Sequence, residues 1–94
     1  MAVTVTFHGF PEIRRATQTT RFRVEPDPPT LGALLAALRE QGVPVGGQLL
    51  TPDGHIRETV QVIRNGDLWL PRDRSDTQLG PGDEITFLFL MAGG

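Results

Sequence analysis

The sequence closes with GPGDEITFLFLMAGG, from Gly80 to Gly94, in which a turn leads into a strand. The Gly-Pro-Gly-Asp part is typical of a chain reversal, and the run after it is rich in the branched and aromatic residues that strands favour. Alternate side chains of a strand share a face. One face carries Ile85, Phe87 and Phe89, and the other carries Thr86, Leu88 and Leu90. We expect the first face to enter a hydrophobic core.

The N-terminus predicts a strand that would start the same sheet. Val3, Val5 and Phe7 alternate with polar residues, the period of two that indicates a half-buried strand. Residues 9–19 contain Gly9 and Pro11 and favour a connection, after which residues 20–24 alternate again. An N-terminal hairpin is therefore expected.

A helix is predicted after a proline-rich break. Thr30 stands where an N-cap is preferred, and leucines follow it at the i, i+3, i+4 and i+7 positions of one helical face. These leucines are Leu31, Leu34, Leu35 and Leu38. Gly42 and Pro44 end the helix. We expect its apolar stripe to pack against the sheet.

The middle of the chain is mostly loop, with one hairpin after it. Residues 43–59 hold several glycines and prolines, and residues 60–64 are strand-like. Asn65-Gly66 then supplies the positive φ values of a type I′ turn, and residues 67–70 would form the return strand.

In order, the elements predict an α+β fold, a mixed sheet of about four to five strands packed on one main helix. A final strand parallel to the first would make this the β-grasp, or ubiquitin-like, arrangement. At 94 residues the chain can close one core but not two. A single domain is expected.

Composition excludes several classes of function. The chain has no cysteine, which rules out disulfides, a cysteine-ligated zinc site and a nucleophilic thiol. The net charge is −2 and the basic residues are spread along the chain, which argues against a nucleic-acid binder. All nine basic residues are arginine, so no side-chain amine is available for acylation. His8 and His55 lack a third ligand at a recognisable spacing, so we expect no metal site.

The expected location is the cytoplasm. The longest apolar run, residues 87–92, is far shorter than the roughly 20 residues of a membrane helix. The alternating N-terminus has neither a basic leader nor an uninterrupted apolar segment, so it does not resemble a signal peptide.

Three stretches carry a resemblance to a known family. They are Asn65-Gly66, then Leu79-Gly80-Pro81-Gly82-Asp83-Glu84-Ile85, and finally Ala92-Gly93-Gly94. With them, the chain resembles the ubiquitin-like sulfur carriers (MoaD/ThiS-like), and most closely the small subunit of molybdopterin synthase. It differs at Leu90-Met91, where members often carry two prolines, and at Arg64, where a small apolar residue is common.

The resemblance implies that the reactive group is the terminal carboxylate of Gly94. An E1-like enzyme would use ATP to adenylate it, and sulfur would then replace AMP to give a thiocarboxylate. Gly93 and Ala92 would thread the tail into the partner, because glycine lets a backbone approach closely. Residues 1–90 would form the β-grasp domain and residues 91–94 a flexible tail reaching roughly 13 Å. The chain itself would bind no cofactor stably and have no autonomous catalytic site.

The resemblance also implies partners and a contact surface. The partners would be the adenylating enzyme and the large subunit of molybdopterin synthase, or another sulfur acceptor, with neither nucleic acid nor membrane. Phe7, Leu68 and Leu88 match the family's apolar contact positions and are the predicted partner-binding residues. The alternative is that all three only complete a small core.

Three functions stay open at this point. The first is sulfur donation in molybdopterin (molybdenum or tungsten cofactor) biosynthesis or in another sulfur pathway. The second is a ubiquitin-like modifier that is joined through Gly94 to target lysines. The third is a non-covalent interaction module in which the Gly-Gly ending is incidental.

Overall fold

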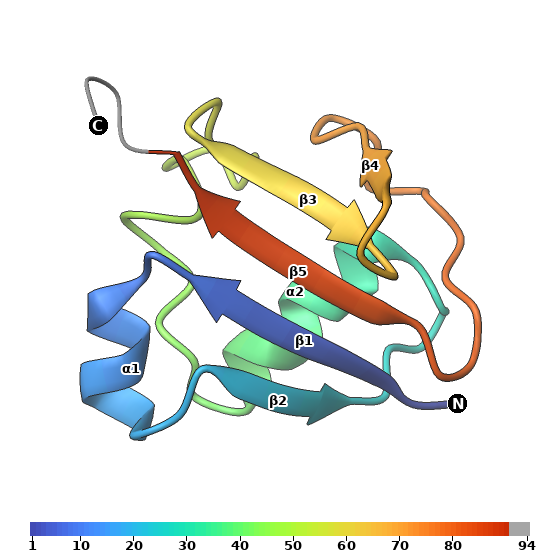
Figure 1. Cartoon of the computed structure of the whole chain (residues 1–94), viewed down its shortest axis with the longest axis horizontal. Coiled ribbons are helices and arrows are strands. Elements are labelled where there is room, and N and C mark those ends of the chain that lie inside the picture. Colours follow the sequence, from blue (N-terminus) through green and yellow to red (C-terminus); the bar gives the residue numbers. More distant parts are fainter. Residues whose placement is uncertain (91–94) are drawn as a thin grey trace.

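The computed structural model describes residues 1–90 and contains one five-stranded sheet with two helices (Figure 1). The strands are β1 (Val3–His8), β2 (Arg21–Val24), β3 (Val60–Arg64), β4 (Leu68–Leu70) and β5 (Glu84–Phe89). The helices are α1 (Pro11–Thr17) and α2 (Leu31–Glu40). The predicted α+β class is confirmed. The predicted flexible tail, residues 91–94, lies outside the described residues.

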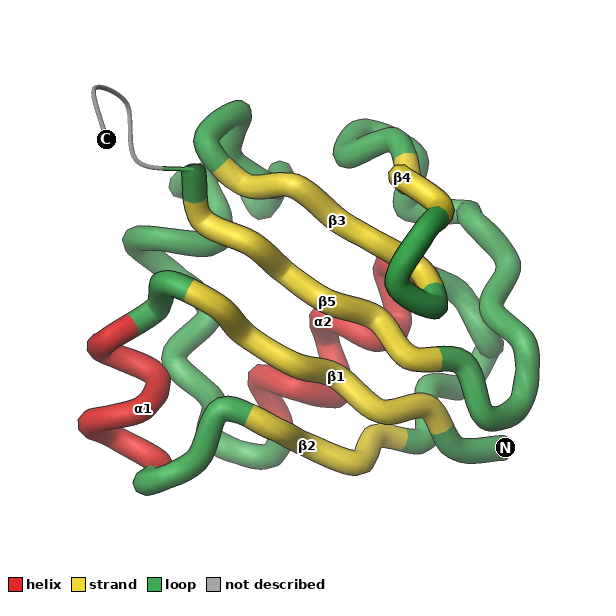
Figure 2. The backbone as a smooth tube through the Cα atoms, in the orientation of Figure 1, coloured by secondary structure: helices red, strands yellow, loops and turns green. Residues whose placement is uncertain are grey.

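The strand order across the sheet is β2-β1-β5-β3-β4, with the first and last strands of the chain at its centre (Figure 2). β1 and β5 run parallel, and Phe7 is opposite Phe87. The other neighbours are antiparallel. This parallel central pair confirms the β-grasp arrangement predicted from the order of the elements.

Helix α2 lies across one face of the sheet, and the hydrophobic core fills the space between them (Figure 1). The Thr30 side chain accepts a hydrogen bond from the backbone N–H of Ala33 at 3.2 Å, as predicted for an N-cap. Leu31, Leu34 and Leu38 are buried, so the predicted apolar stripe of the helix does face the sheet.

The sequence prediction missed helix α1 within residues 9–19. Pro11 occupies its first turn, where a missing N–H costs no helical hydrogen bond. Ile13 is its one buried residue, so a helix this short shows no apolar periodicity. The Ile13 side chain closes one end of the core.

The long loop between α2 and β3 also contributes to the core. Val43, Val45, Leu49, Leu50 and Ile56 are all buried there, although the segment forms only isolated bridges. Backbone hydrogen bonds tie it together, among them Leu50 N–H to Val45 O at 3.0 Å. The loop therefore adds apolar side chains to the same core that α2 covers.

The β3–β4 hairpin has the predicted turn. Asn65 and Gly66 have φ values of 53° and 81°, as a type I′ turn requires. The return strand and the final strand are each one residue shorter than expected. Leu68 begins β4, and β5 ends at Phe89.

Candidate functional site

The described chain reaches Leu90 just past the end of β5, at the same end of the sheet as the end of β1. The Leu90 N–H donates to the carbonyl of Thr59 at 2.7 Å, which anchors the last described residue beside β3. Phe89 packs its ring against Phe10, with ring centroids 6.0 Å apart. The point from which residues 91–94 continue is thus fixed by both backbone and side-chain contacts.

Gly9 makes this close packing possible. Its φ is +86°, and a Cβ added to it would come within 3.0 Å of the Phe89 Cβ. Any other residue would meet Phe89 and also require an unfavourable backbone conformation. Sequence reasoning took Gly9 only as part of a connection, because its neighbour in space is eighty residues away in the chain.

No helix covers the second face of the sheet within residues 1–90, and we call it the free face (Figure 2). The strand pairings place one row of side chains across it in the order Arg21, Thr6, Thr86, Ile63, Trp69. The next row runs His8, Leu88, Gln61. An apolar group of Ile63, Trp69 and Leu88 therefore lies toward β4, and Trp69 is 58% exposed.

The three predicted partner-binding residues do not form one surface. Leu88 is half-buried on the free face. Leu68 is 53% exposed, but the register puts it on the opposite side of β4 from Trp69. Their partner-binding roles stay predictions.

The prediction that Phe7 lies on the contact surface is wrong. Phe7 is 1% exposed and stacks on Phe87 at a centroid distance of 5.3 Å. It shares the core side of β1 with Val3 and Val5, so the next residue, His8, occupies the free face.

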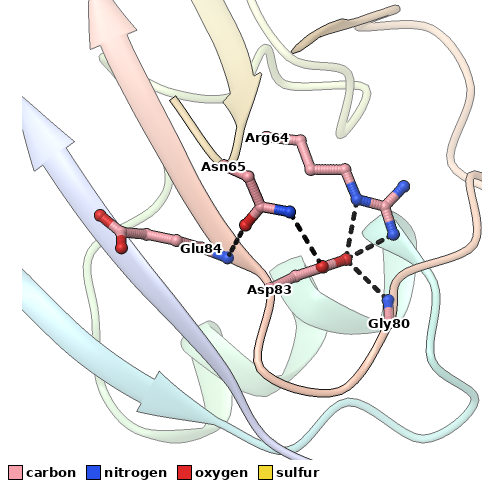
Figure 3. A network of polar contacts seen from close by, with 5 residues as sticks. All are labelled: Arg64, Asn65, Gly80, Asp83 and Glu84. Carbon is pink, nitrogen blue, oxygen red and sulfur yellow. Dashed lines mark hydrogen bonds and ion pairs between the residues drawn. The ribbon is translucent and has the colours of Figure 1, made fainter. Parts of the chain in front are cut away.

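A polar cluster fixes the other end of β5 (Figure 3). The Asp83 carboxylate accepts hydrogen bonds from Arg64 Nε at 2.8 Å, Asn65 Nδ2 at 3.2 Å and Gly80 N–H at 2.7 Å. The Glu84 N–H donates to Asn65 Oδ1 at 2.8 Å. Arg64, the residue that departs from the family pattern, is thus the ion-pair partner of Asp83.

Burial raises the pKa of Asp83, whereas the hydrogen bonds from Gly80, Arg64 and Asn65 and the charge of Arg64 lower it. The net effect is a lowered pKa of Asp83, so its carboxylate stays ionised at pH values below the ordinary pKa of an aspartate. The cluster joins the β3–β4 turn to the start of β5. It is far along β5 from Leu90, and we assign it a structural role.

The described residues contain no group of three or more histidine, aspartate or glutamate side chains arranged to hold a metal ion. Among residues 1–90, no helix is long and apolar enough to cross a membrane. The candidate site consists of the free face and the anchored end of β5.

The model of the ThiS family matches residues 10–94 of the chain. The chain belongs to the ThiS family. The match includes Ala92, Gly93 and Gly94, the residues predicted to carry and thread the reactive group, which lie outside the described part of the structure. The predicted membership among the ubiquitin-like sulfur carriers (MoaD/ThiS-like) is confirmed.

Solved structures share the fold of this ThiS-family chain. SAMP1 from Haloferax volcanii is 20% identical, with a TM-score of 0.78 and full coverage of both chains. CysO from Mycobacterium tuberculosis is 22% identical, with a TM-score of 0.75 and coverage of 95% of this chain and 99% of that one.

The crystal structure of the Amycolatopsis orientalis BexX/CysO complex contains a chain 18% identical to the present one. Its TM-score is 0.75, with coverage of 98% of this chain and 99% of that one. A search of curated protein sequences finds no match.

Proposed function

We propose that this ThiS-family protein is a sulfur carrier that works through the carboxylate of Gly94. The observation that carries the proposal is the anchored end of β5, which fixes the chain at Leu90 immediately before Met91-Ala92-Gly93-Gly94. A four-residue extension reaches roughly 13 Å, enough to enter an active site while the domain stays outside it.

The chemistry requires no side chain of this protein. The Gly94 carboxylate oxygen attacks the α-phosphorus of ATP, pyrophosphate leaves, and the product is an acyl-adenylate. A sulfur nucleophile then attacks the acyl carbon, and AMP leaves with the oxygen. The resulting thiocarboxylate donates its sulfur to an electrophilic carbon. A chain without cysteine is compatible with this route, because the sulfur is held by the terminal acyl group.

The partners in this proposal are an E1-like adenylating enzyme, which uses the ATP, and a sulfur acceptor. We propose the large subunit of molybdopterin synthase as the acceptor, on the basis of the motifs around Asn65-Gly66 and residues 79–85. The chain would then be the small subunit of that synthase, acting in the cytoplasm. Contact would be made by the apolar group Ile63, Trp69 and Leu88, with Leu68 at the sheet edge.

Intact-mass measurement tests the carrier function directly. The purified chain is incubated with the E1-like enzyme of its source organism, ATP and a sulfide donor, and its mass should rise by about 16 Da as oxygen is replaced by sulfur. A variant lacking Gly93 and Gly94 should show no shift. An unchanged mass in the intact chain, with ATP consumption verified on another carrier, would refute the proposal.

A second candidate function is protein modification through Gly94. The observation that favours it is structural likeness to SAMP1 of Haloferax volcanii, a small archaeal modifier protein. Activation would be the same, but a target lysine amine would attack the acyl carbon and form an isopeptide bond. Peptides that carry a Gly94-derived remnant on lysine, recovered from denatured cell extract, would support this function. Their absence, together with a thiocarboxylate in the same cells, would exclude it.

A further inference from the structure

The nine arginines occur along the whole chain, but four of them fall in one short segment. Residues 10–25 hold four arginines and two glutamates, a formal charge of +2, whereas the remaining residues sum to −4 in a chain of net charge −2. This cationic segment comprises α1 and β2, which lie at one side of the molecule (Figure 1). The difference in charge comes from the arginines, because acidic residues are about equally frequent in this segment, with two in 16 positions, and in the rest of the chain, with nine in 78.

The strand register shows which of these arginines lie on the free face. Arg21 is opposite Thr6 and Arg23 is opposite Thr4, so both belong to the free face. Both side chains are exposed, and neither forms an ion pair within residues 1–90, where the salt bridges are Arg64–Asp83 and Arg74–Asp76. Their guanidinium groups are available to carboxylates from outside.

A cleft extends this charge toward the end of β5. Its volume is about 410 Å³, and its lining includes His8, Phe10, Arg14 and Thr20. Phe10 also packs on Phe89, so the cleft lies beside the place where the described chain ends. We call Arg14, Arg21 and Arg23 the cationic margin.

The backbone of β2 is closed to strand addition, so recognition at this edge must use side chains. Thr19 Oγ1 accepts from the Arg21 N–H at 3.1 Å and donates to the Arg21 carbonyl at 3.2 Å. Gln41 Nε2 donates to the Arg23 carbonyl at 3.2 Å. Three outward-facing polar groups of this edge strand are therefore already satisfied, which removes the template for an added strand.

The free face thus changes character from one edge to the other. Arg21 stands at the β2 edge and Trp69 at the β4 edge of the same row, four strand spacings or roughly 19 Å apart. Thr6, Thr86 and Ile63 separate them. Glu84 is the acidic residue that the pairings place on this face, in the row of Arg23. A partner that fits this face needs an apolar area opposite Trp69 and Leu88 and carboxylates opposite β2.

We propose that the cationic margin recognises an acidic rim on the E1-like adenylating enzyme that receives the C-terminal tail. This inference rests on the proposed carrier function and adds the chemistry of the partner's surface. Charges at the border of an interface chiefly speed association and select the partner, and their effect falls with ionic strength. The apolar group of the free face would supply the contact that is independent of salt.

The test measures the affinity of the E1-like adenylating enzyme for the chain at low and high salt. Replacing both Arg21→Glu and Arg23→Glu should raise Kd about tenfold or more at low salt and about twofold at high salt, since screening weakens the repulsion. Arg14→Glu should act in the same direction. Arg39→Glu is the control, because Arg39 is exposed on α2, the helix that packs on the face of the sheet opposite the free face. The Kd of this variant should equal that of the unaltered chain.

The outcomes separate this inference from the carrier function. If the double variant is converted to the thiocarboxylate but binds as tightly as the unaltered chain, the cationic margin has no role and the carrier function stands. If the unaltered chain is not converted, the carrier function fails, and the inference fails with it. Two further measurements ask whether the cationic margin binds something else: a mobility-shift assay with transfer RNA detects nucleic-acid binding, and sedimentation of the chain alone detects self-association. RNA binding or self-association that the double variant abolishes would overturn the assignment to an acidic protein surface.

Discussion

Replacing Arg64 by alanine should destabilise the fold by removing one of three donors to a nearly buried carboxylate. The Asp83 side chain is 12% exposed and that of Arg64 is 23% exposed, so this ion pair is more buried than a surface pair but not fully buried. A hydrogen bond to a charged group contributes about 1.5 to 3 kcal/mol, whereas exposed pairs contribute about 0 to 1 kcal/mol. We therefore expect Arg64→Ala to lower the free energy of unfolding by about 2 kcal/mol at pH 7.

The loss should depend on pH in a definite direction. Because the folded pKa of Asp83 is lower than its unfolded value of about 3.9, its ionised form stabilises the fold above that value. This contribution disappears as the pH falls through the folded pKa. The difference between the unaltered chain and Arg64→Ala should therefore be largest at neutral pH and shrink below about pH 4.

Urea denaturation at pH 7 and at acidic pH measures both effects. Arg74→Ala is the matched control, since Arg74 forms the other ion pair of the described chain but both partners are well exposed. It should leave the urea midpoint unchanged within error. An equal loss in the two variants, or a loss for Arg64→Ala that persists undiminished in acid, would refute the role assigned to the Asp83 cluster.

Further predictions concern single positions and use the same unfolding assay. Gly9→Ala should destabilise by more than about 1 kcal/mol, because alanine is strained at a φ of +86° and meets Phe89; a midpoint equal to that of the unaltered chain would contradict this packing. Thr30→Ala should cost about 1 kcal/mol through loss of the N-cap, and Thr30→Ser should restore most of it. Thr6→Val should raise stability by about 1 kcal/mol, because the buried Thr6 hydroxyl has no partner within residues 1–90; a lower midpoint would count against this.

Local patterns predicted most of the fold because most elements carry their own signals. The leucine spacing after Thr30, the Asn65-Gly66 turn and the alternation in the first and last strands each depend on neighbours in sequence. Helix α1 was missed because a single buried residue, Ile13, produces no period. The core role of the loop within residues 43–59 was missed for a related reason, since irregular backbone buries side chains without any repeat.

The free face was harder to predict than the fold. The alternation of apolar and polar residues assigns the side chains of a strand to two faces, but it does not say which face packs against the core. For β1 the pattern itself places Phe7 with Val3 and Val5, and the structure buries all three. The assignment of Phe7 to a surface followed the family's positions instead, whereas His8 is the β1 residue that lies opposite Leu88 on the free face. For β5 the choice between faces was correct, with Ile85 and Phe87 buried and Leu88 on the free face.

The remaining members of the free face depend on pairings between strands far apart in sequence. Ile63 and Trp69 become neighbours through the β3–β4 hairpin, which a local turn predicts, but their row continues to Thr86 and Arg21 only through β5 and β1. The parallel pairing of β1 with β5 also brings Gly9 against Phe89, where the described chain ends. One non-local pairing therefore determines both the composition of the free face and the position of Leu90, the last described residue. Under the proposed function, a mutation that shifts this register should weaken partner binding and sulfur loading together.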